Sequence, residues 1–375
     1  MSVSLVDLAE SRWLPDWLVR FGIRRLLRRR LSLRRRLLKS ARAAAAKSQS
    51  QKVPSATTAL VNELRESPLV IAAADANHQH YEVPTEFFRT VLGPRLKYSC
   101  GIWPRERMSL DESEVAMLAL TCERAEIKNG MEVLDLGCGW GSLSLWIAEK
   151  YPACRVLAVS NSGTQREYIE HVCAQEGIHN LQVKTSNIAD FTTERTFDRV
   201  VSIEMFEHVR NYELLLEKIS GWLKVDGKLF VHIFCHRVFA YLFESEGPAN
   251  WMAKNFFTGG IMPSANLLGE FFKDMEIDAQ WLLEGSHYSR TCEAWLDNLD
   301  ANAEQLFELF CHKRTQRESR VQLQRWRMFF MACSELFRFR NGGEWGVGHY
   351  LLSRRQKSAA VKRAQGSNER VFVSS

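Results

Sequence analysis

The sequence of 375 residues contains no uninterrupted apolar run of the roughly 18 residues that a membrane-spanning helix needs. It also lacks an apolar segment followed by a small-residue cleavage site, so we expect no secretory signal peptide. Nine cysteines are present, but none forms a CxxC pair, and their spacing fits neither a zinc site nor a disulfide framework. We therefore expect reduced thiols, a cytoplasmic location and no bound metal.

Acidic residues are missing from residues 17–62, which carry 13 lysines and arginines. The whole chain has a net charge of +6, so the rest of it is net acidic and the basic character belongs to this arm. Large apolar residues alternate with the arginines at helical spacing, among them Trp17, Phe21, Leu26 and Leu27. The pattern predicts either a helix that contacts an anionic membrane through residues 17–42 or a helix packed on the main domain with solvated arginines.

Two other functions of such an arm find less support. Mitochondrial transit peptides are arginine-rich but poor in acids, and Asp7, Glu10 and Asp16 near the start argue against one. No RNP, zinc-finger or KH signature accompanies the basic residues, so we expect no nucleic-acid partner. The oligomeric state stays open.

Apolar segments of strand length alternate with helical segments through the middle of the chain. Such alternation predicts an α/β fold with a parallel sheet, whose ligands bind at the carboxyl ends of the strands. We expect a helix near 86–91 and one over 111–125 with Asp111 as its N-cap, whereas 96–103 has strand or turn character and 43–58 is a linker or weak helix. Further strands are expected at 131–136, 155–160, 181–185, 197–203, 228–234, 276–283 and 345–352, with helices at 142–150, 163–176, 212–222 and over most of 292–340.

Three closely spaced glycines, Gly137, Gly139 and Gly141, follow the first of these strands and Asp135. Glycines at a strand-to-helix turn let the backbone approach a ligand. The GxGxG spacing differs from the dinucleotide fingerprint and looks like the cofactor loop of S-adenosylmethionine-dependent methyltransferases. The alternative is a glycine-rich turn in another α/β protein.

The next strand ends without the acidic residue that binds ribose in NAD enzymes. Ser160, Asn161 and Gln165 stand there instead. This argues against a dehydrogenase and predicts that amides and hydroxyls hold the nucleoside.

Glu204, Glu207 and His208 lie within five residues at the end of the fourth strand. Methyl transfer from a sulfonium requires alignment, exclusion of water and removal of one proton. An imidazole near neutral pKa suits that proton, and carboxylates can hold a cationic substrate. The alternative is that the carboxylates only favour a helix N-terminus and that His208 is a surface group.

Several motifs together resemble the cyclopropane fatty acid synthase superfamily of methyltransferases, and most closely its coclaurine N-methyltransferase branch. They run in family order over about 76–352, and residues 14–20 also look like the N-terminal helices of that branch. The resemblance implies a Rossmann-like seven-stranded sheet with an N-terminal helical arm and a helical substrate cap. The motifs are His80-Tyr-Glu-Val-Pro-Thr, Leu96-Lys-Tyr-Ser-Cys, Val133-Leu-Asp-Leu-Gly-Cys-Gly-Trp-Gly-Ser, Ser202-Ile-Glu-Met-Phe-Glu-His, Leu229-Phe-Val-His-Ile-Phe-Cys-His, Phe256-Phe-Thr-Gly-Gly and His287-Tyr-Ser-Arg-Thr.

The resemblance also implies the division of the chain: 1–75 arm and linker, 76–235 cofactor-binding core, 236–344 substrate-covering elements, 345–356 last strand, and 357–375 flexible tail. It implies catalytic or substrate-binding roles for Glu204, Glu207 and His208. Residues expected at the S-adenosylmethionine site are Tyr98, Ser99, Gly137, Gly139, Gly141, Ser160, Asn161, Gln165, Asn187, Ile188 and Ile203. Asn187 departs from the family, which often has Asp there.

The lipid-modifying branch of the superfamily adds an alternative. There the positions of Cys100, Glu207, His232 and Tyr288 hold a bicarbonate, and all four residue types are kept here. The leading hypothesis is N-methylation of a small or amphiphilic amine. The second is cyclopropanation or C-methylation of an unsaturated acyl chain in a phospholipid, with the arm on the membrane, and the third is a methyltransferase-like protein that only binds.

Overall fold

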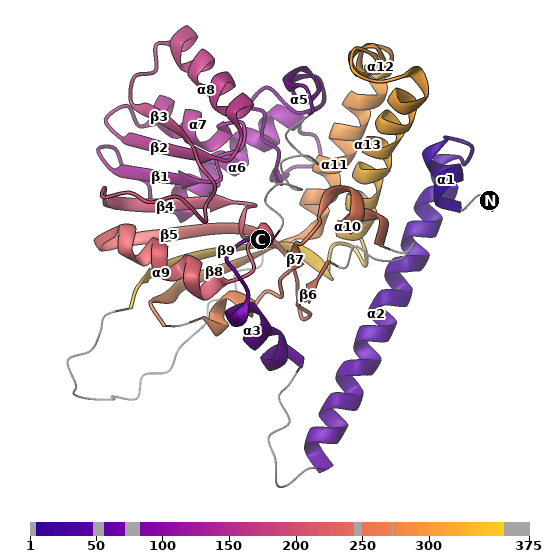
Figure 1. Cartoon of the computed structure of the whole chain (residues 1–375), viewed down its shortest axis with the longest axis horizontal. Helices are drawn as coiled ribbons and strands as arrows, with labels where there is room; N and C mark the ends of the chain where they lie inside the picture. Colours follow the sequence, from indigo (N-terminus) through magenta and orange to yellow (C-terminus); the bar gives the residue numbers. More distant parts are fainter. Residues whose placement is uncertain (1–4, 48–55, 72–82, 244–249, 272, 356–375) are drawn as a thin grey trace.

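The centre of the molecule is a seven-stranded sheet with helices on both faces (Figure 1). The computed structural model describes residues 5–47, 56–71, 83–243, 250–271 and 273–355. Strands β1 to β5 are parallel, and β9 and β8 add to the β5 edge so that β9 runs antiparallel to both its neighbours. In sheet order the strands are β3 (Leu181–Thr185), β2 (Arg155–Ser160), β1 (Glu132–Leu136), β4 (Phe197–Ile203), β5 (Leu223–His236), β9 (Trp345–Arg354) and β8 (Met275–Glu284).

Alternate residues of the central strands bury opposite faces of this sheet. Val133 and Val201 pack under α6 and α7, whereas Leu134 and Val200 pack under α9 and α3. Period-two burial on both faces explains why these strands read as continuous apolar runs. The helices around the sheet are α3 (Ala56–Glu66), α5 (Thr85–Val91), α6 (Leu110–Arg124), α7 (Ser142–Lys150), α8 (Gly163–Glu176) and α9 (Tyr212–Trp222).

The predicted α/β fold is confirmed, with three local corrections. Ser109, not Asp111, caps α6, because its hydroxyl accepts from the N–H of Glu112 and the Glu112 carboxylate accepts from the N–H of Ser109. Strand β5 begins at Leu223, directly after α9, so it is longer than the predicted 228–234. Residues 96–103 form no strand, and their backbone is irregular.

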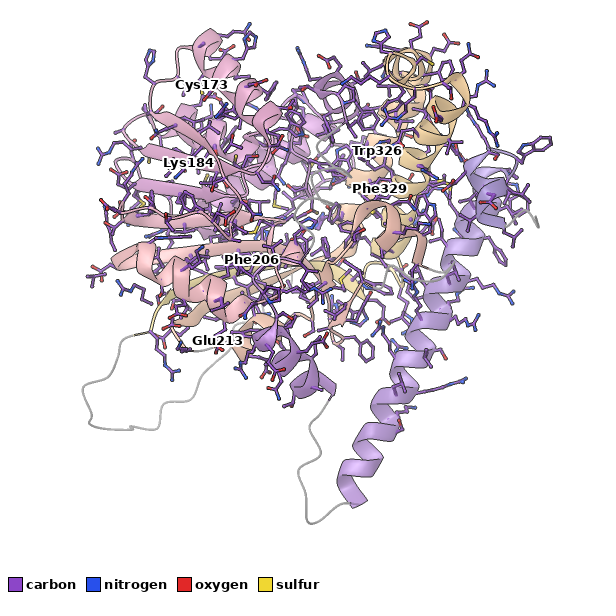
Figure 2. All side chains as sticks on the ribbon, in the orientation of Figure 1. Cys173, Lys184, Phe206, Glu213, Trp326 and Phe329 are labelled. Atoms are coloured by element: carbon purple, nitrogen blue, oxygen red, sulfur yellow. The ribbon has the colours of Figure 1, made fainter. Side chains whose placement is uncertain are left out.

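A second group of helices stands beside the sheet. It consists of α10 (Trp251–Phe256), α11 (Gly285–Ala301), α12 (Ala303–Cys311) and α13 (Gln316–Phe337). Figure 2 shows Trp326 and Phe329 on α13, where both pack against Phe256 of α10. Short elements complete this part: η1 (Phe206–His208), β6 (Tyr241–Leu242), β7 (Ile261–Met262) and η3 (Leu267–Glu270). The domain boundaries stay a prediction, and 357–375 and the first half of the motif at His80, residues 80–82, lie outside the described residues.

The basic arm folds as α1 (Leu5–Glu10) and the long helix α2 (Asp16–Lys47), which lies along α13 (Figure 1). Val19, Leu27 and Leu31 are buried against the body, so Leu27, which the membrane alternative grouped with Trp17 on a bilayer-facing side, packs on the body instead. The helix buries Leu27 because its contact stripe follows α13, whereas Trp17 and Phe21 remain exposed. Helix α2 reaches Lys47, into the predicted linker or weak helix. Within the described part of the chain, no helix combines the length and apolar character needed to cross a membrane.

Several arginines of α2 pair with carboxylates of the body. Arg20 donates to both carboxylate oxygens of Glu293 at 2.6 and 2.7 Å, and Arg24 lies 3.0 Å from the buried carboxylate of Glu335. Arg35 bonds Glu344. Carboxylates of the acidic body thus pair with some of the positive charges of the arm. This corrects the expectation of a packed helix whose arginines are solvated.

Candidate active site

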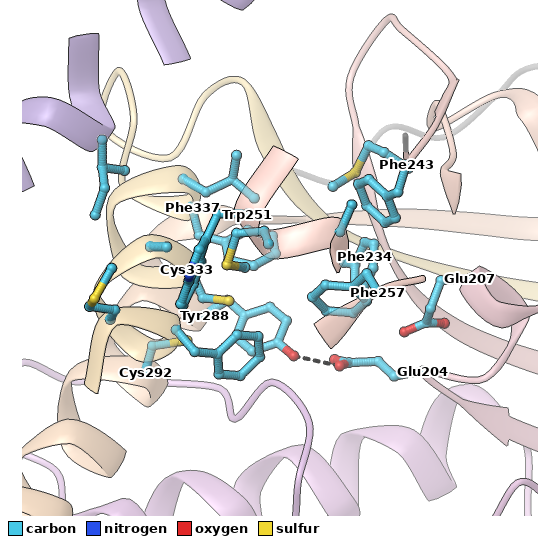
Figure 3. A pocket seen from close by; sticks show the side chains of 18 of the residues that line it. Glu204, Glu207, Phe234, Phe243, Trp251, Phe257, Tyr288, Cys292, Cys333 and Phe337 are labelled. Carbon is cyan, nitrogen blue, oxygen red and sulfur yellow. Dashed lines mark hydrogen bonds between the residues drawn. The ribbon is translucent and has the colours of Figure 1, made fainter. Parts of the chain in front are cut away.

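One large cavity, of about 1210 Å³, connects the carboxyl ends of β1 and β4 with the helices beside the sheet and with the arm. Its inner end is polar and holds the glycine turn and the Glu204 cluster. Its outer part is aromatic and aliphatic, with walls from α2, α10 and α13 (Figure 3). Such a cavity suits a ligand with one polar, reactive end and an apolar body.

The glycine turn after β1 has the backbone of a ligand-binding loop. Gly137, Gly139 and Gly141 all have positive φ, at +84°, +54° and +78°. A Cβ on Gly137 would strike Met205 and one on Gly141 would strike Ile169, so these two glycines allow close packing. A Cβ on Gly139 would meet no atom of the described residues within 4 Å, because Gly139 lines the cavity.

Asp135, the second-last residue of β1, lies just before this turn and lines the same cavity. Its Oδ2 accepts from Ser144 at 2.6 Å, whereas its buried Oδ1 has no hydrogen-bond partner among the described residues. Burial raises the pKa of Asp135 to about 6. An unsatisfied buried acceptor beside an open cavity is typical of a site that a polar ligand completes.

The predicted cofactor residues divide into two groups. Gln165 lines the cavity, and Ser160 orients it by donating to its Oε1 at 2.6 Å. Tyr98, Ser99, Gly137, Gly139 and Ile203 also line the cavity. The cavity wall does not include Gly141, Ser160, Asn161, Asn187 or Ile188.

Glu204 lies at the centre of the polar end, with its side chain only 8 % exposed. Its Oε1 accepts from the N–H of Cys100 at 3.0 Å and lies 3.2 Å from Nε2 of His232. Its Oε2 accepts from the hydroxyl of Tyr288 at 2.5 Å, which Figure 3 marks with a dashed line. Three of the residues predicted from sequence therefore surround a single carboxylate.

Glu207 and His208 follow on the turn η1 and both line the cavity. Burial and the nearby charge of Glu204 raise the pKa of Glu207 well above its usual value. Burial also raises the pKa of Glu204, but its hydrogen bonds and the charges of Lys97 and His208 act in the opposite direction. Glu204 is therefore the more readily ionised of the two acids. His208 stacks on Phe257, with the ring centroids 6.2 Å apart.

The structure adds residues that the sequence did not single out. Lys97 is buried, donates to Ser99 Oγ at 2.5 Å and to the carbonyl of Cys100 at 2.7 Å, and has a pKa lowered by burial. Its place beside Ser99 and Cys100 in a recognised motif was the one available signal. His349 lies 2.8 Å from His232, but it belongs to the last strand, and only the register of β5 with β9 brings the two together.

Comparison with known proteins gives consistent matches over most of the chain. A family model described as mycolic acid cyclopropane synthetase matches residues 70–343. An (S)-coclaurine N-methyltransferase of Thalictrum flavum subsp. glaucum is 40% identical over 300 residues, which are 79% of this chain and 83% of that protein.

Solved structures agree. A coclaurine N-methyltransferase bound to N-methylheliamine and SAH has a TM-score of 0.82 and 36% identity, and the match covers 93% of this chain and 97% of that one. A mycolic acid cyclopropane synthase complexed with SAH and CTAB has a TM-score of 0.65 and 25% identity, covering 76% of this chain and 99% of that one. The likeness to the first structure therefore extends across nearly the whole chain.

Proposed function

The chain belongs to the mycolic acid cyclopropane synthetase family of S-adenosylmethionine-dependent methyltransferases, and from that premise we propose that it methylates the nitrogen of an amphiphilic amine. In this proposal Glu204 holds the amine, and His208 takes the proton that nitrogen loses. The apolar part of the substrate lies between the arm and α13.

The inner end of the cavity fits the cofactor. Gly139 leaves room for a ligand against the backbone, Asp135 presents a free buried oxygen, and Gln165 is held in place by Ser160. Tyr98 and Ser99 line the same cavity and would help to hold the cofactor. When bound, S-adenosylmethionine supplies an already activated methyl group, so the residues of this chain have only to position the acceptor and manage its proton.

The observation that carries the choice of an amine is the position of the Glu204 carboxylate. Cys100, His232 and Tyr288, to which the resemblance assigns bicarbonate in the lipid-modifying branch, all contact this carboxylate here. The set therefore does not fit a bicarbonate in this structure, because its donors are already used. A fixed anion in the same place attracts a protonated amine, whereas an alkene is neutral when it binds and gains no such attraction.

The protonation states of the cluster suit that role. Glu204 accepts three hydrogen bonds and stays anionic, so it can bind the ammonium form of the substrate. The substrate nitrogen must lose its ammonium proton before it can attack the methyl group. His208 lines the same cavity, and its imidazole can accept that proton. The neutral carboxyl of Glu207 adds no second charge that would hold the ammonium form too tightly.

The outer cavity supports an amphiphilic acceptor. Leu26, Leu33 and Leu37 of α2 are exposed yet line the cavity, facing aromatic residues of the body such as Phe243 and Trp251. Arg29 and Arg30 stand on the same wall. An apolar chain or ring system would cover these leucines, and contact of the arm with an anionic membrane, included in our proposal, would place such a substrate near the opening.

The test uses the full chain, labelled S-adenosylmethionine, a series of primary to tertiary amines with short or long alkyl groups, and vesicles of unsaturated anionic phospholipid. We expect label on amines, with kcat/KM rising with the apolar size of the amine. A 14-dalton gain on acyl chains without amine methylation would overturn the proposal.

His208→Ala in the same assay should lower kcat by roughly 100-fold or more and leave cofactor affinity within about twofold. Titration calorimetry with S-adenosylhomocysteine measures that affinity. Unchanged kcat would remove His208 from the mechanism, and loss of binding would show that it holds the cofactor instead.

A further inference from the structure

A line of side chains leads from Glu204 away from the cavity to the surface. His232 Nε2 lies 3.2 Å from Glu204 Oε1, and His232 Nδ1 lies 2.8 Å from Nε2 of His349. Arg124 then approaches Nδ1 of His349 at 2.9 Å. The two histidines are opposite each other in the β5–β9 register and fully buried, whereas Arg124, the last residue of α6, is partly exposed.

The chemistry of these groups fixes the direction of every hydrogen bond. A guanidinium has only donors, so Nδ1 of His349 must accept from Arg124. Burial lowers the pKa of both histidines well below the usual value, so each is neutral and carries one proton. His349 therefore has its proton on Nε2 and donates to Nδ1 of His232. His232 in turn has its proton on Nε2 and donates to Glu204.

We propose that Arg124 is a positioning residue, which selects the tautomers of His349 and His232 so that an N–H group faces Glu204 and holds its carboxylate as an acceptor. Arg124 lies outside the cavity wall and acts only through the two imidazoles. The catalytic consequence rests on the proposed function of Glu204, whereas the tautomers themselves do not.

Without Arg124 the direction of the hydrogen bonds between His349, His232 and Glu204 can reverse. His349 would be free to carry its proton on Nδ1 and to accept from Nδ1 of His232, which would turn the lone pair of His232 Nε2 toward Glu204. A lone pair facing a carboxylate is repulsive, and protonation of Glu204 relieves the repulsion. Loss of Arg124 should therefore raise the pKa of Glu204 and reduce substrate binding at low pH.

The other groups around Glu204 are unchanged by this substitution. Cys100 and Lys97 face it from the segment before α6, Glu207 and His208 from η1, and Tyr288 and Cys292 from α11. None of them is bonded to Arg124, so a change in the pH dependence after substitution of Arg124 would pass through the histidines.

A purely structural role is the competing explanation, because Arg124 also stacks over Trp281 at 4.9 Å. Arg95 offers a matched control. It stacks over Trp146 at 5.2 Å and pairs with Glu149 at the surface, but it contacts neither histidine. Arg95→Met thus removes an arginine–tryptophan contact and leaves the line of side chains intact.

The first experiment is ¹⁵N NMR of the full chain with labelled histidine, which reports which ring nitrogen carries the proton. In the native protein we expect His232 and His349 both to be protonated on Nε2 at pH 7. A native protein with either histidine protonated on Nδ1 would overturn the proposal, whether or not any amine is methylated.

The second experiment compares the pH profile of kcat/KM for the native chain, Arg124→Met, Arg124→Lys and Arg95→Met. In Arg124→Met the acidic limb of the profile should move to a pH about one unit higher. At pH values below the limb kcat/KM should therefore be roughly tenfold lower than in the native chain, and at pH values above the limb it should stay within about twofold. Arg124→Lys keeps a donor and should restore the native limb, and Arg95→Met should not move it. An equal loss at every pH in Arg124→Met, with unchanged histidine spectra, would assign Arg124 a structural role only.

Discussion

Glu204 is held in a backbone conformation that non-glycine residues seldom adopt. Its φ is +49°, in the left-handed region, directly after β4. Such strain persists where surrounding contacts outweigh it, and the three hydrogen bonds to the carboxylate supply those contacts. The strained backbone of this turn is therefore the cost of placing the Glu204 carboxylate at the cavity.

Glu204→Gly should separate these two effects. Glycine accepts positive φ without strain, so we expect the melting temperature to stay within a few degrees of the native value. Turnover of amines should fall by roughly 100-fold or more, because the anion is lost. The space left between Cys100, His232 and Tyr288 fits a small carboxylate, and added formate should restore activity at least tenfold in the variant and not in the native chain. Absence of rescue, with the fold intact, would argue against a role for the carboxylate itself.

His236 carries a prediction on acid stability. Its Nδ1 accepts from the N–H groups of Val238 and Phe239, both at 2.9 Å, and burial lowers its pKa to about 4. As the pH falls below 6.5, His236 becomes protonated in the unfolded chain but stays neutral in the folded chain. The free energy of unfolding therefore decreases between pH 6.5 and pH 4. The loss from this residue should be about 2 kcal/mol.

Urea unfolding at pH 7.0 and 4.5 measures this effect. His236→Asn keeps an acceptor for the two N–H groups but cannot titrate, so its free energy of unfolding should fall less between the two pH values than that of the native chain. His179→Asn, on the surface, should behave like the native chain. A native slope in His236→Asn would contradict the assignment and leave His232 and His349 as the source.

The residues that could be predicted from spacing alone are those brought together by short segments, whereas Cys100, His232 and Tyr288 were indicated only by the family resemblance. Glu204, Glu207 and His208 share one turn, and the glycines share another, so local order was enough. The line through His349 to Arg124 depends on strand register and on where α6 ends, and neither is encoded in local spacing. Lys97 was hidden for another reason, because a lysine is seldom fully buried and was not expected inside the site.

At the scale of elements, periodicity predicted most of the strands and helices because each buries a regular face. The bounds of β2, α8, β3 and β4 agree with the sequence. Segment 96–103 could not be predicted in the same way, since it is held by single contacts such as Cys100 to Glu204 and Trp103 to His287 and not by a repeating pattern. The first residues of β5 were also missed, because they continue directly from α9.

The attachment of α2 depends on a few ion pairs as well as on apolar contact. Arg20 joins Glu293 on α11 and lies 3.3 Å from Glu335 on α13, whose side chain is 1 % exposed. Replacing Arg20 leaves Arg24 as a partner of Glu335, which limits the cost of the buried charge. We expect Arg20→Met to reduce the free energy of unfolding by about 2 kcal/mol.

Hydrogen exchange locates this loss. Amides of α2 should exchange faster in Arg20→Met, while amides of β1 and β4 keep their protection. Arg28→Met removes a solvent-exposed arginine of the same helix and should leave the exchange of α2 unchanged. Equal protection of α2 in all three proteins would mean that apolar packing alone holds the arm.

At the scale of the whole molecule, the arm faces two environments. One side of α2 closes the cavity over α13, and the other carries Trp17 into solvent, near Trp13 in the segment before the helix. Deleting the arm would therefore expose the apolar side of α13 as well as remove any membrane contact. Substitutions on the outer side are the sharper test of membrane binding.

Trp13, in the segment before α2, and Trp17, in the first turn of α2, are 79 % and 67 % exposed, so both can enter the interfacial layer of a bilayer while the arginines of α2 meet anionic headgroups. Trp13→Gln combined with Trp17→Gln should weaken binding to anionic vesicles at least tenfold in a sedimentation assay. Methylation of a short, water-soluble amine should stay within about twofold, since neither residue lines the cavity. Val225→Gln combined with Val238→Gln removes two exposed apolar side chains elsewhere and should bind vesicles like the native chain. If both double variants bind equally well, the outer face of the arm has another purpose, and substrates reach the cavity from water.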